Sequence, residues 1–246
     1  MNLLIHIGSY FLLMKRAFGR PDRWKVLYQQ TIREVDKLGI NSIPIVMIVS
    51  LFVGAALTIQ TEFNIESPLL PRYLVGLTVR DALLLEFSSS MIALVLAGKV
   101  GSSITSEIGM MRVTEQIDAL EVMGINSASY LILPRITASF FFFPILCLIS
   151  IILGITGGYL TCVLANVIPP SDYIYGIRFS FYPYYISYAL IKMACYALII
   201  TTVCSYHGYN VKGGAQEVGR SSTRSVVLSS VLILAANLLL TKIILQ

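Results

Sequence analysis

The chain contains 36 consecutive residues, from Ile136 to Ser171, without a single charged side chain. About 20 apolar residues are enough for a helix to cross the hydrocarbon core of a membrane. The backbone polar groups of such a segment must be satisfied within the segment itself, which favours an α-helix. Asn166 and the Pro169-Pro170 pair are expected to end this helix. The stretch therefore predicts a membrane span over residues 136–165.

Four other apolar runs are long enough to cross a membrane. The run from Leu38 to Thr61 has no charge over 24 residues, and the run from Tyr184 to Ser205 contains only Lys192. The five predicted spans cover residues 38–61, 82–101, 136–165, 184–205 and 225–241. Charged residues make up 13% of the chain, about half the share of a soluble domain. We expect an all-α integral membrane protein in which residues 39–246 form one five-span domain.

Residues 1–38 form a separate N-terminal region in this interpretation. Residues 22–38 mix apolar side chains with seven charged ones, a composition typical of a helix lying in the membrane interface. We expect an interfacial elbow helix that leads into the first span. A frayed basic tail is the alternative.

Basic residues give the predicted orientation. Seven of the 18 basic residues fall within the first 37 positions, and these are Lys15, Arg16, Arg20, Arg23, Lys25, Arg33 and Lys37. With the N-terminus inside, more of the remaining basic loop residues also lie inside, as the positive-inside rule requires. We expect an inner N-terminus and an outer C-terminus. The cluster would face anionic lipid headgroups rather than nucleic acid, because no soluble domain presents it.

Polar side chains within the predicted spans are the first functional signal. Lys192 lies roughly 12 Å into the fourth span at about 1.5 Å per residue, where an unpaired cation costs at least ~2.5 kcal/mol. Glu86 and Ser88 enter the second span from the same predicted side, and Gln60 and Glu62 close the first span there. Glu86 and Lys192 either pair and fix helix packing, or line a pocket for the headgroup of an amphiphile. The two interpretations are compatible.

Catalytic, metal and nucleotide sites have no support in the sequence. Residues 93–100 read ALVLAGKV, but Ala93 and Val100 replace the glycine and the hydroxyl residue of a phosphate loop, and the segment is an apolar helix. The four cysteines lie in apolar runs without paired spacing, and the two histidines are far apart. We therefore expect no enzymatic activity, no metal and no cofactor bound by this chain.

The segment between the second and third spans has helical spacing. Val113, Ile117, Leu120 and Met123 recur every three or four residues, and the acidic residues fall between them. This pattern predicts a short amphipathic helix.

Two stretches resemble a known family. Residues 97–124 read AGKVGSSITSEIGMMRVTEQIDALEVMG, and residues 208–230 read GYNVKGGAQEVGRSSTRSVVLSS. They are similar to the two signature stretches of the MlaE permease family, the membrane subunits of ABC-type lipid transporters. The first stretch is very specific, because it holds Ala-Gly-Lys/Arg-x-Gly-Ser, then Glu-Ile-Gly, then Met-Arg-x-Thr-Glu-Gln-Ile. Weaker likeness in the first and fourth spans extends the resemblance along nearly the whole chain.

The resemblance implies a homodimer in the bacterial inner membrane that carries phospholipid and has a periplasmic C-terminus. It implies a cytoplasmic ABC ATPase that uses ATP and Mg, a periplasmic MCE-domain ring, and room for a small cytoplasmic accessory subunit. The ATPase would dock on a coupling helix at about 107–123. Its expected contacts are Glu107, Arg112, Glu115, Asp118 and Glu121. The expected lipid-binding residues are Gln60, Glu62, Glu86, Ser88 and Lys192.

One departure from the family pattern bears on the pocket. The family commonly has Arg-Glu-Leu-Gly/Ala-Pro at the start of the second span, where this chain has Leu85-Glu86-Phe87-Ser88-Ser89. The glutamate is kept and the arginine and proline are lost, which puts in doubt any pocket that relies on the arginine. Two other functions stay open: a secondary transporter with Glu86 and Lys192 as a proton relay, and a membrane scaffold without cargo.

Overall fold

The structure is a computed structural model that describes residues 2–19, 24–65 and 71–245. Arg20 and Arg23 of the predicted basic cluster lie outside these residues. The protein is 89% helical, and no strand occurs in the part of the chain that the structure describes. The predicted all-α class is confirmed.

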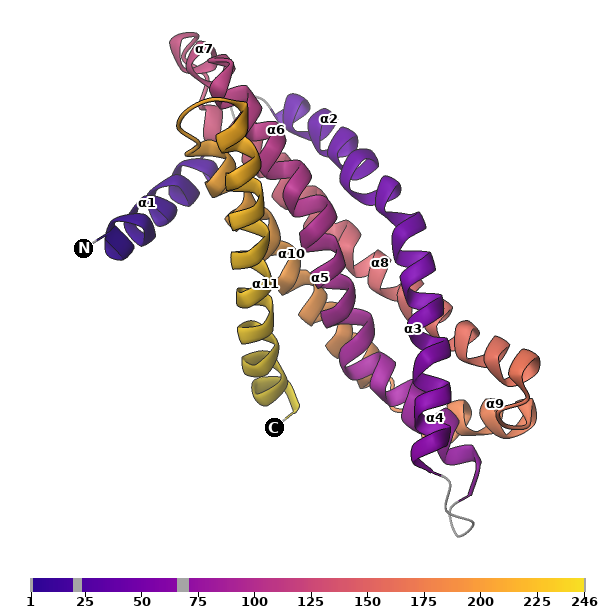
Figure 1. Cartoon of the computed structure of the whole chain (residues 1–246). Coiled ribbons are helices and arrows are strands. Elements are labelled where there is room, and N and C mark those ends of the chain that lie inside the picture. The colour runs from indigo at the N-terminus through magenta and orange to yellow at the C-terminus, as the bar shows by residue number, and fades with distance from the viewer. Residues whose placement is uncertain (1, 20–23, 66–70, 246) are drawn as a thin grey trace. The chain divides into compact units, whose positions relative to one another are not determined.

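Five helical segments among the described residues are long and apolar enough to cross a membrane (Figure 1). They run over Trp24–Asn64, Tyr73–Val113, Ser127–Ala165, Tyr184–Tyr209 and Ala215–Ile244. The prediction of five spans is therefore confirmed. The prediction that residues 1–38 and 39–246 are separate domains stays a prediction.

The first two segments are composite helices. The first consists of α2 (Trp24–Glu34), a π-helical turn η1 (Val35–Gly39), a 3₁₀ turn η2 (Ile40–Ser42) and α3 (Ile43–Asn64). The second consists of α4 (Tyr73–Ala82), the π-helical η3 (Leu83–Met91), α5 (Ile92–Leu96), the π-helical η4 (Ala97–Gly101) and α6 (Ser102–Val113). π-helical turns are rare and occur frequently at functional sites, and no sequence pattern predicted these.

The other spans are single helices, and three shorter helices accompany them. The spans are α8 (Ser127–Ala165), α10 (Tyr184–Tyr209) and α11 (Ala215–Leu245). The shorter helices are α1 (Asn2–Ala17), α7 (Gln116–Val122) and α9 (Pro170–Arg178). Helix α2 occupies the region predicted as an elbow, and α7 occupies most of the region predicted as an amphipathic helix. Their roles as elbow and coupling helix stay predictions.

Two helices extend past charged residues that bounded the predicted spans. The second segment begins at Tyr73 rather than residue 82, and α8 begins at Ser127 rather than residue 136. The charged residues within these extensions are Arg80 and Arg135, and each is only 2% exposed. Both guanidinium groups pair with carboxylates, so neither charge has to end the helix at the water boundary.

Helix α9 was not predicted. Helix α8 ends at Ala165, as expected, just before Asn166, which has a left-handed φ of 51°, and Pro170 is the first residue of α9. Proline suits the first helical position, because its missing N–H would have no helical partner there. Arg80 donates from Nη1 to the carbonyl oxygens of Ile177 (2.9 Å) and Phe179 (2.7 Å) at the end of this helix. The arginine therefore serves as a C-terminal cap.

The chain divides into two compact units. Unit 1 comprises Met1–Ser42, Leu94–Phe143 and Ala194–Leu239, and unit 2 comprises Ile43–Ala93, Pro144–Met193 and Leu240–Gln246. The core of unit 2 is formed by Val75, Val79, Leu83, Cys162, Ile168 and Tyr173. Within this unit α4 packs alongside α9 (Figure 1).

Unit 1 is held together by small hydroxyl residues. The hydroxyl groups of Thr105 in α6 and Ser225 in α11 are hydrogen-bonded to each other at 2.7 Å. The Thr105 hydroxyl also lies 3.1 Å from the carbonyl oxygen of Cys204 in α10, to which it can donate. Gly208 packs against the backbone of Thr105. In a membrane, where hydrophobic association is weak, small and hydroxyl residues of this kind hold helices at close range.

Helices α3 and α8 approach closely in unit 2 through glycines. A Cβ atom added to Gly54 would lie 1.8 Å from the carbonyl oxygen of Gly154, and one added to Gly157 would lie 2.2 Å from that of Leu51. Ser50 donates to Ser150 across the same contact at 2.8 Å. The obstructing atoms belong to the backbone, so they cannot move aside as a flexible side chain would.

We expect Gly54→Ala to destabilise the protein by about 2 kcal/mol or more, because the added methyl group forces the two helices apart. Gly219→Ala is the matched control, because nothing lies within 4 Å of a Cβ atom at that helical position; it should leave stability unchanged or raise it by up to about 1 kcal/mol, since alanine favours a helix over glycine. Unfolding of the purified protein by titration with sodium dodecyl sulfate measures both. Equal stability of the two variants would contradict the close contact.

Candidate functional site

A fully buried lysine lies at the centre of the candidate site in unit 2. Lys192 of α10 has 0% exposed side chain, and its Nζ lies 3.0 Å from Glu86 Oε1. The ammonium also donates to the carbonyl oxygen of Leu85 at 3.0 Å. The two predicted residues are therefore brought together, and the interpretation in which they pair is confirmed. A buried cation of this kind requires such partners.

Two hydroxyl groups complete the surroundings of the ammonium. Lys192 Nζ donates to Tyr188 Oη at 3.0 Å and lies 3.3 Å from Thr241 Oγ1. Those two hydroxyls are 2.8 Å from each other, and Thr241 also donates to Glu86 Oε1 at 3.3 Å. The ammonium lies 4.7 Å from the centre of the Tyr188 ring. Its charge is thus held by four acceptors and an aromatic ring.

The carboxylate is the exposed member of this pair. The Glu86 side chain is 41% exposed, although its lysine partner is enclosed. Glu86 lies within the nine-residue π-helical η3, and Ser90 donates to its second oxygen at 3.1 Å. Ser88 Oγ is buried and has no hydrogen-bond partner among the described residues. The site therefore presents a half-exposed carboxylate with the half-buried Ser90 hydroxyl bonded to it, and no exposed ammonium.

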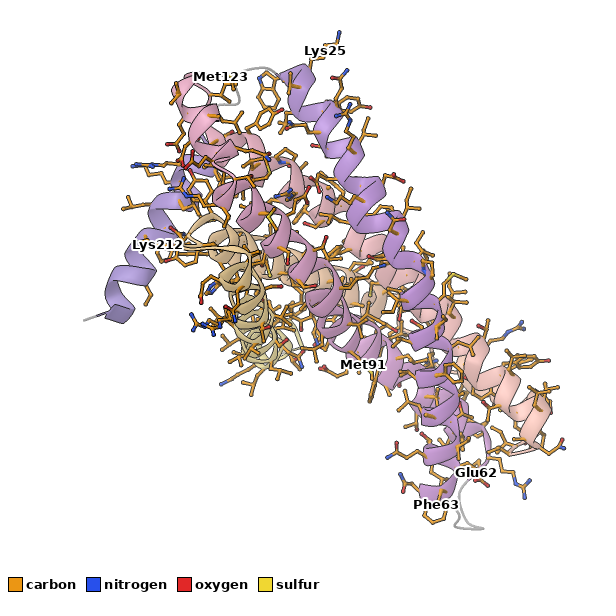
Figure 2. All side chains as sticks on the ribbon, turned by 45° about the horizontal axis from the view of Figure 1, so that its top comes forward. Lys25, Glu62, Phe63, Met91, Met123 and Lys212 are labelled. Carbon is orange, nitrogen blue, oxygen red and sulfur yellow. The ribbon has the colours of Figure 1, made fainter. Side chains whose placement is uncertain are left out.

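Two predicted lipid-binding residues are not part of this cluster. Gln60 and Glu62 lie near the end of α3, where Gln60 is exposed and Glu62 is half-buried. Figure 2 shows Glu62 and the neighbouring Phe63 at this end of the helix. Among the described residues, the hydrogen bonds and ion pairs of Lys192 go to other side chains and to Leu85, and not to Gln60 or Glu62. Their role in lipid binding stays a prediction.

The predicted ATPase contacts lie in unit 1, on α6, α7 and the turn between them. Glu107 lies within α6 and forms ion pairs with Lys37 and Arg135. Arg112 and Asp118 bind each other at 2.6 Å across the turn. Glu115 is exposed and has a left-handed φ of 58°, which ends α6 and lets α7 begin at Gln116. Glu121 accepts hydrogen bonds from Ser127 and Tyr209, both at 2.9 Å.

The tip of α7 exposes apolar side chains. Ile117 is fully buried, as its position in the predicted apolar face requires, but Val122 is 89% exposed and Met123 is 65% exposed. Figure 2 shows Met123 at this tip. Exposed apolar residues beside charged ones are suited to contact another protein.

Several residues of both regions were missed by sequence reasoning. Tyr188 lies four residues before Lys192, so helical spacing could have found it. Leu85 contributes a backbone carbonyl, and Thr241 comes from a helix 49 residues further along the chain. No sequence pattern signals either of these. Arg135 bounded the predicted third span and Glu34 fell within the predicted interfacial helix, so their ion pair was not expected.

The fold and the site together define a multi-pass membrane protein with a polar cluster inside its spans. Among the described residues, no group of three His, Cys, Asp or Glu side chains is placed to hold a metal ion.

Comparison with known proteins identifies the family. Residues 31–243 match the family described as Permease MlaE, and the chain belongs to this family of ABC-type permeases. It is 33% identical to a probable ABC transporter permease protein of Rickettsia bellii, over 99% of this chain and 93% of that protein. It is 29% identical to the intermembrane phospholipid transport system permease protein MlaE of Haemophilus influenzae, over 95% and 89%. It is also 32% identical to the chloroplastic protein trigalactosyldiacylglycerol 1 of Arabidopsis thaliana, over 90% and 63%.

We expect Glu86→Gln to destabilise the protein, because it leaves the enclosed ammonium without its counter-charge. Removing one partner of a fully buried ion pair lowers the stability of a protein by about 3–5 kcal/mol. For Glu86→Gln we expect a loss of about 1–2 kcal/mol, since the carboxylate is half-exposed and its charge is partly screened. Adding Lys192→Met should restore part of the loss, with a coupling energy of about 1–2 kcal/mol. Detergent titration of both single variants and the double variant measures this coupling. If the double variant loses as much stability as the two single variants together, Glu86 and Lys192 do not interact.

The pKa of Glu121 yields a pH prediction. The hydrogen bonds from Ser127 and Tyr209 hold its pKa below the ordinary 4.5. Because the folded pKa is the lower one, the stabilisation is complete above the ordinary value and is lost as pH falls through the folded pKa. Tyr209→Phe should therefore lower the melting temperature at neutral pH, and the difference from wild type should shrink below pH 4.5. A difference in melting temperature between wild type and Tyr209→Phe that does not change with pH would contradict this explanation.

Proposed function

We propose that this protein is the permease subunit of an ABC transporter that moves phospholipid between the inner membrane and a periplasmic MCE-protein conduit. A separate ATPase chain binds ATP and Mg and drives the movement. The proposal takes its cargo from the resemblance to phospholipid-transport permeases, one of which is the MlaE protein of Haemophilus influenzae. Two copies form the transport unit in the inner membrane, with cytoplasmic N-termini and periplasmic C-termini.

The assignment of the cargo rests on one observation: the Glu86 side chain is half-exposed, whereas its partner Lys192 is enclosed. The pair is neutral, and only its acidic member is exposed, with the half-buried Ser90 hydroxyl beside it. A zwitterionic headgroup can present its ammonium to Glu86 and take hydrogen bonds from hydroxyls, while its acyl chains lie along apolar helices. This supports a phospholipid with a cationic amine better than a purely anionic lipid. Lys192 then acts by fixing the carboxylate in place, because it has no exposed surface of its own.

The surface that fits the ATPase is the turn between α6 and α7. It offers the exposed Glu115, the Arg112–Asp118 pair and the apolar tip of Val122 and Met123. Nucleotide binding brings the two ATPase copies together and displaces this turn in each permease. A change in lipid affinity follows only if the two states bind lipid differently. Glu107 and Glu121 have internal partners, so their contribution to docking would be indirect.

The lipid assignment is tested by mass spectrometry of the protein purified in mild detergent. Wild type should retain phospholipid, with amine headgroups enriched over the membrane extract. Glu86→Gln should lose about fivefold or more of the bound lipid, because one charged contact is worth about 1 kcal/mol or more. Ser230→Ala serves as a control, since it removes a hydroxyl that bonds only within α11. Wild-type protein without any retained phospholipid would favour a scaffold instead.

The docking surface yields a separate prediction. Glu115→Lys together with Asp118→Lys should release the ATPase, because both substitutions reverse exposed charges, while the permease dimer stays intact. Co-purification with the ATPase and size-exclusion chromatography measure the two properties. Arg220→Glu, an exposed reversal on α11, should leave the ATPase bound. A double variant that still purifies with its ATPase would contradict this assignment.

A further inference from the structure

Four charged side chains join three helices within unit 1. Arg135 of α8 binds Glu34, the last residue of α2, with Nε at 3.2 Å from Oε1. Its Nη2 lies 2.9 Å from Glu107 Oε2 in α6. Glu107 Oε2 is also 2.6 Å from Lys37 Nζ in the π-helical turn η1. These four residues are called the ionic clamp below.

Two side chains of the ionic clamp are largely buried, which makes its ion pairs costly to break. The Arg135 side chain is only 3% exposed and that of Glu34 is 16% exposed, whereas Lys37 and Glu107 are partly exposed. Two positive and two negative charges balance. A buried guanidinium that loses a carboxylate partner is left uncompensated, which is strongly unfavourable. Helix α6 therefore cannot move away from α2 and α8 without either dragging these partners along or breaking a buried ion pair.

The ionic clamp lies at the one place where the first long helical segment is irregular. Glu34 and Lys37 flank the start of η1, and η2 follows immediately. Such π and 3₁₀ turns inside a long helix often mark a hinge. We refer to Val35–Ser42, the residues of η1 and η2, as the hinge segment.

Two further contacts hold the hinge segment against the same helices. A Cβ atom on Gly39 would lie 2.4 Å from Cδ1 of Phe142 in α8, so a larger residue there would require the phenylalanine ring or the backbone to shift. Lys99 of η4 donates from Nζ to the carbonyl oxygen of Asn41. The hinge segment is therefore attached to α8 by packing, and to the η4–α6 helix by one hydrogen bond and one ion pair.

The position of Glu107 connects the ionic clamp to the turn that fits the ATPase. Helix α6 continues without a break from Glu107 to Val113, where the turn into α7 begins. A helix of this length is a stiff rod, so a displacement of the turn reaches Glu107 directly. The α6 to α7 turn is itself fixed by the Arg112–Asp118 pair.

We propose that Glu107 and Arg135 are positioning residues that transmit the displacement of α6 to the hinge segment. This inference rests on the proposed function. Nucleotide binding by the ATPase moves the α6–α7 turn, Glu107 moves with α6, and the ionic clamp changes the conformation of η1 and η2. The first membrane span follows because the hinge segment continues into α3 within one helical segment. Glu107 thus acts on the permease itself, and not as a surface contact for the ATPase.

Hydrogen exchange of the hinge segment tests this inference in the permease purified with its ATPase. In wild type, amide exchange of residues 35–42 should differ between the nucleotide-free complex and the complex with a non-hydrolysable ATP analogue and Mg. We expect a difference of about fivefold or more. In Glu107→Gln the ATPase should still bind, but the nucleotide-dependent difference should be lost. Glu217→Gln is the matched control, because it removes a carboxylate from an exposed pair on α11 and should respond as wild type does.

Lys37→Gln is a milder variant that removes only the exposed member of the ionic clamp, and it should reduce the response even if Glu107→Gln does not fold. The inference is overturned by a wild-type hinge segment that does not respond to nucleotide, or by variants that respond as wild type does. Loss of the ATPase from Glu107→Gln alone would also overturn it, in favour of a direct contact. A wild-type permease that binds no ATPase at all would contradict the proposed function first, and this inference with it.

Discussion

The buried ammonium of Lys192 is the constraint on which the candidate site depends. A cation without exposed surface inside a membrane-spanning helix has to find acceptors within the protein. It finds a carboxylate, a backbone carbonyl and two hydroxyls, from three separate parts of the chain. These contacts fix the position of Glu86 and of the π-helical segment that carries it. The half-exposed carboxylate is then the group that a cargo can reach.

The same principle explains the other buried charges. Arg80 binds Asp81 and the end of α9, and Arg135 forms ion pairs with Glu34 and Glu107. Each of these cations lies inside a helix and has at least one partner on a neighbouring helix, although Asp81 follows Arg80 directly within α4. In a chain so poor in charge, a few such groups determine where helices are held together. Glycine contacts such as Gly54 against Gly154 then set how closely the helices approach.

The number and class of the helices were predictable because hydrophobic length is a direct physical requirement for crossing a membrane. The pairing of Glu86 with Lys192 was predictable as one of two interpretations, since an unpaired charge at that depth is too costly. The limits of the spans were not predictable, because a buried and paired Arg80 or Arg135 reads in sequence as a charge at a water boundary. The π-helical turns and Thr241 were also out of reach, since they depend on contacts between distant segments. Glu107 stays a predicted ATPase contact; no sequence pattern indicated that it forms ion pairs with Lys37 and Arg135.

The energy source distinguishes an ABC permease from a proton-coupled carrier that uses the same pair of side chains. Both would place Glu86 and Lys192 in the transport route, and only one requires a partner ATPase. The direct measurement is transfer of fluorescent phospholipid out of liposomes that contain the permease with its ATPase. We expect transfer that requires ATP and Mg and that continues when a protonophore collapses the proton gradient. Transfer that persists without the ATPase and stops with the protonophore would contradict the account.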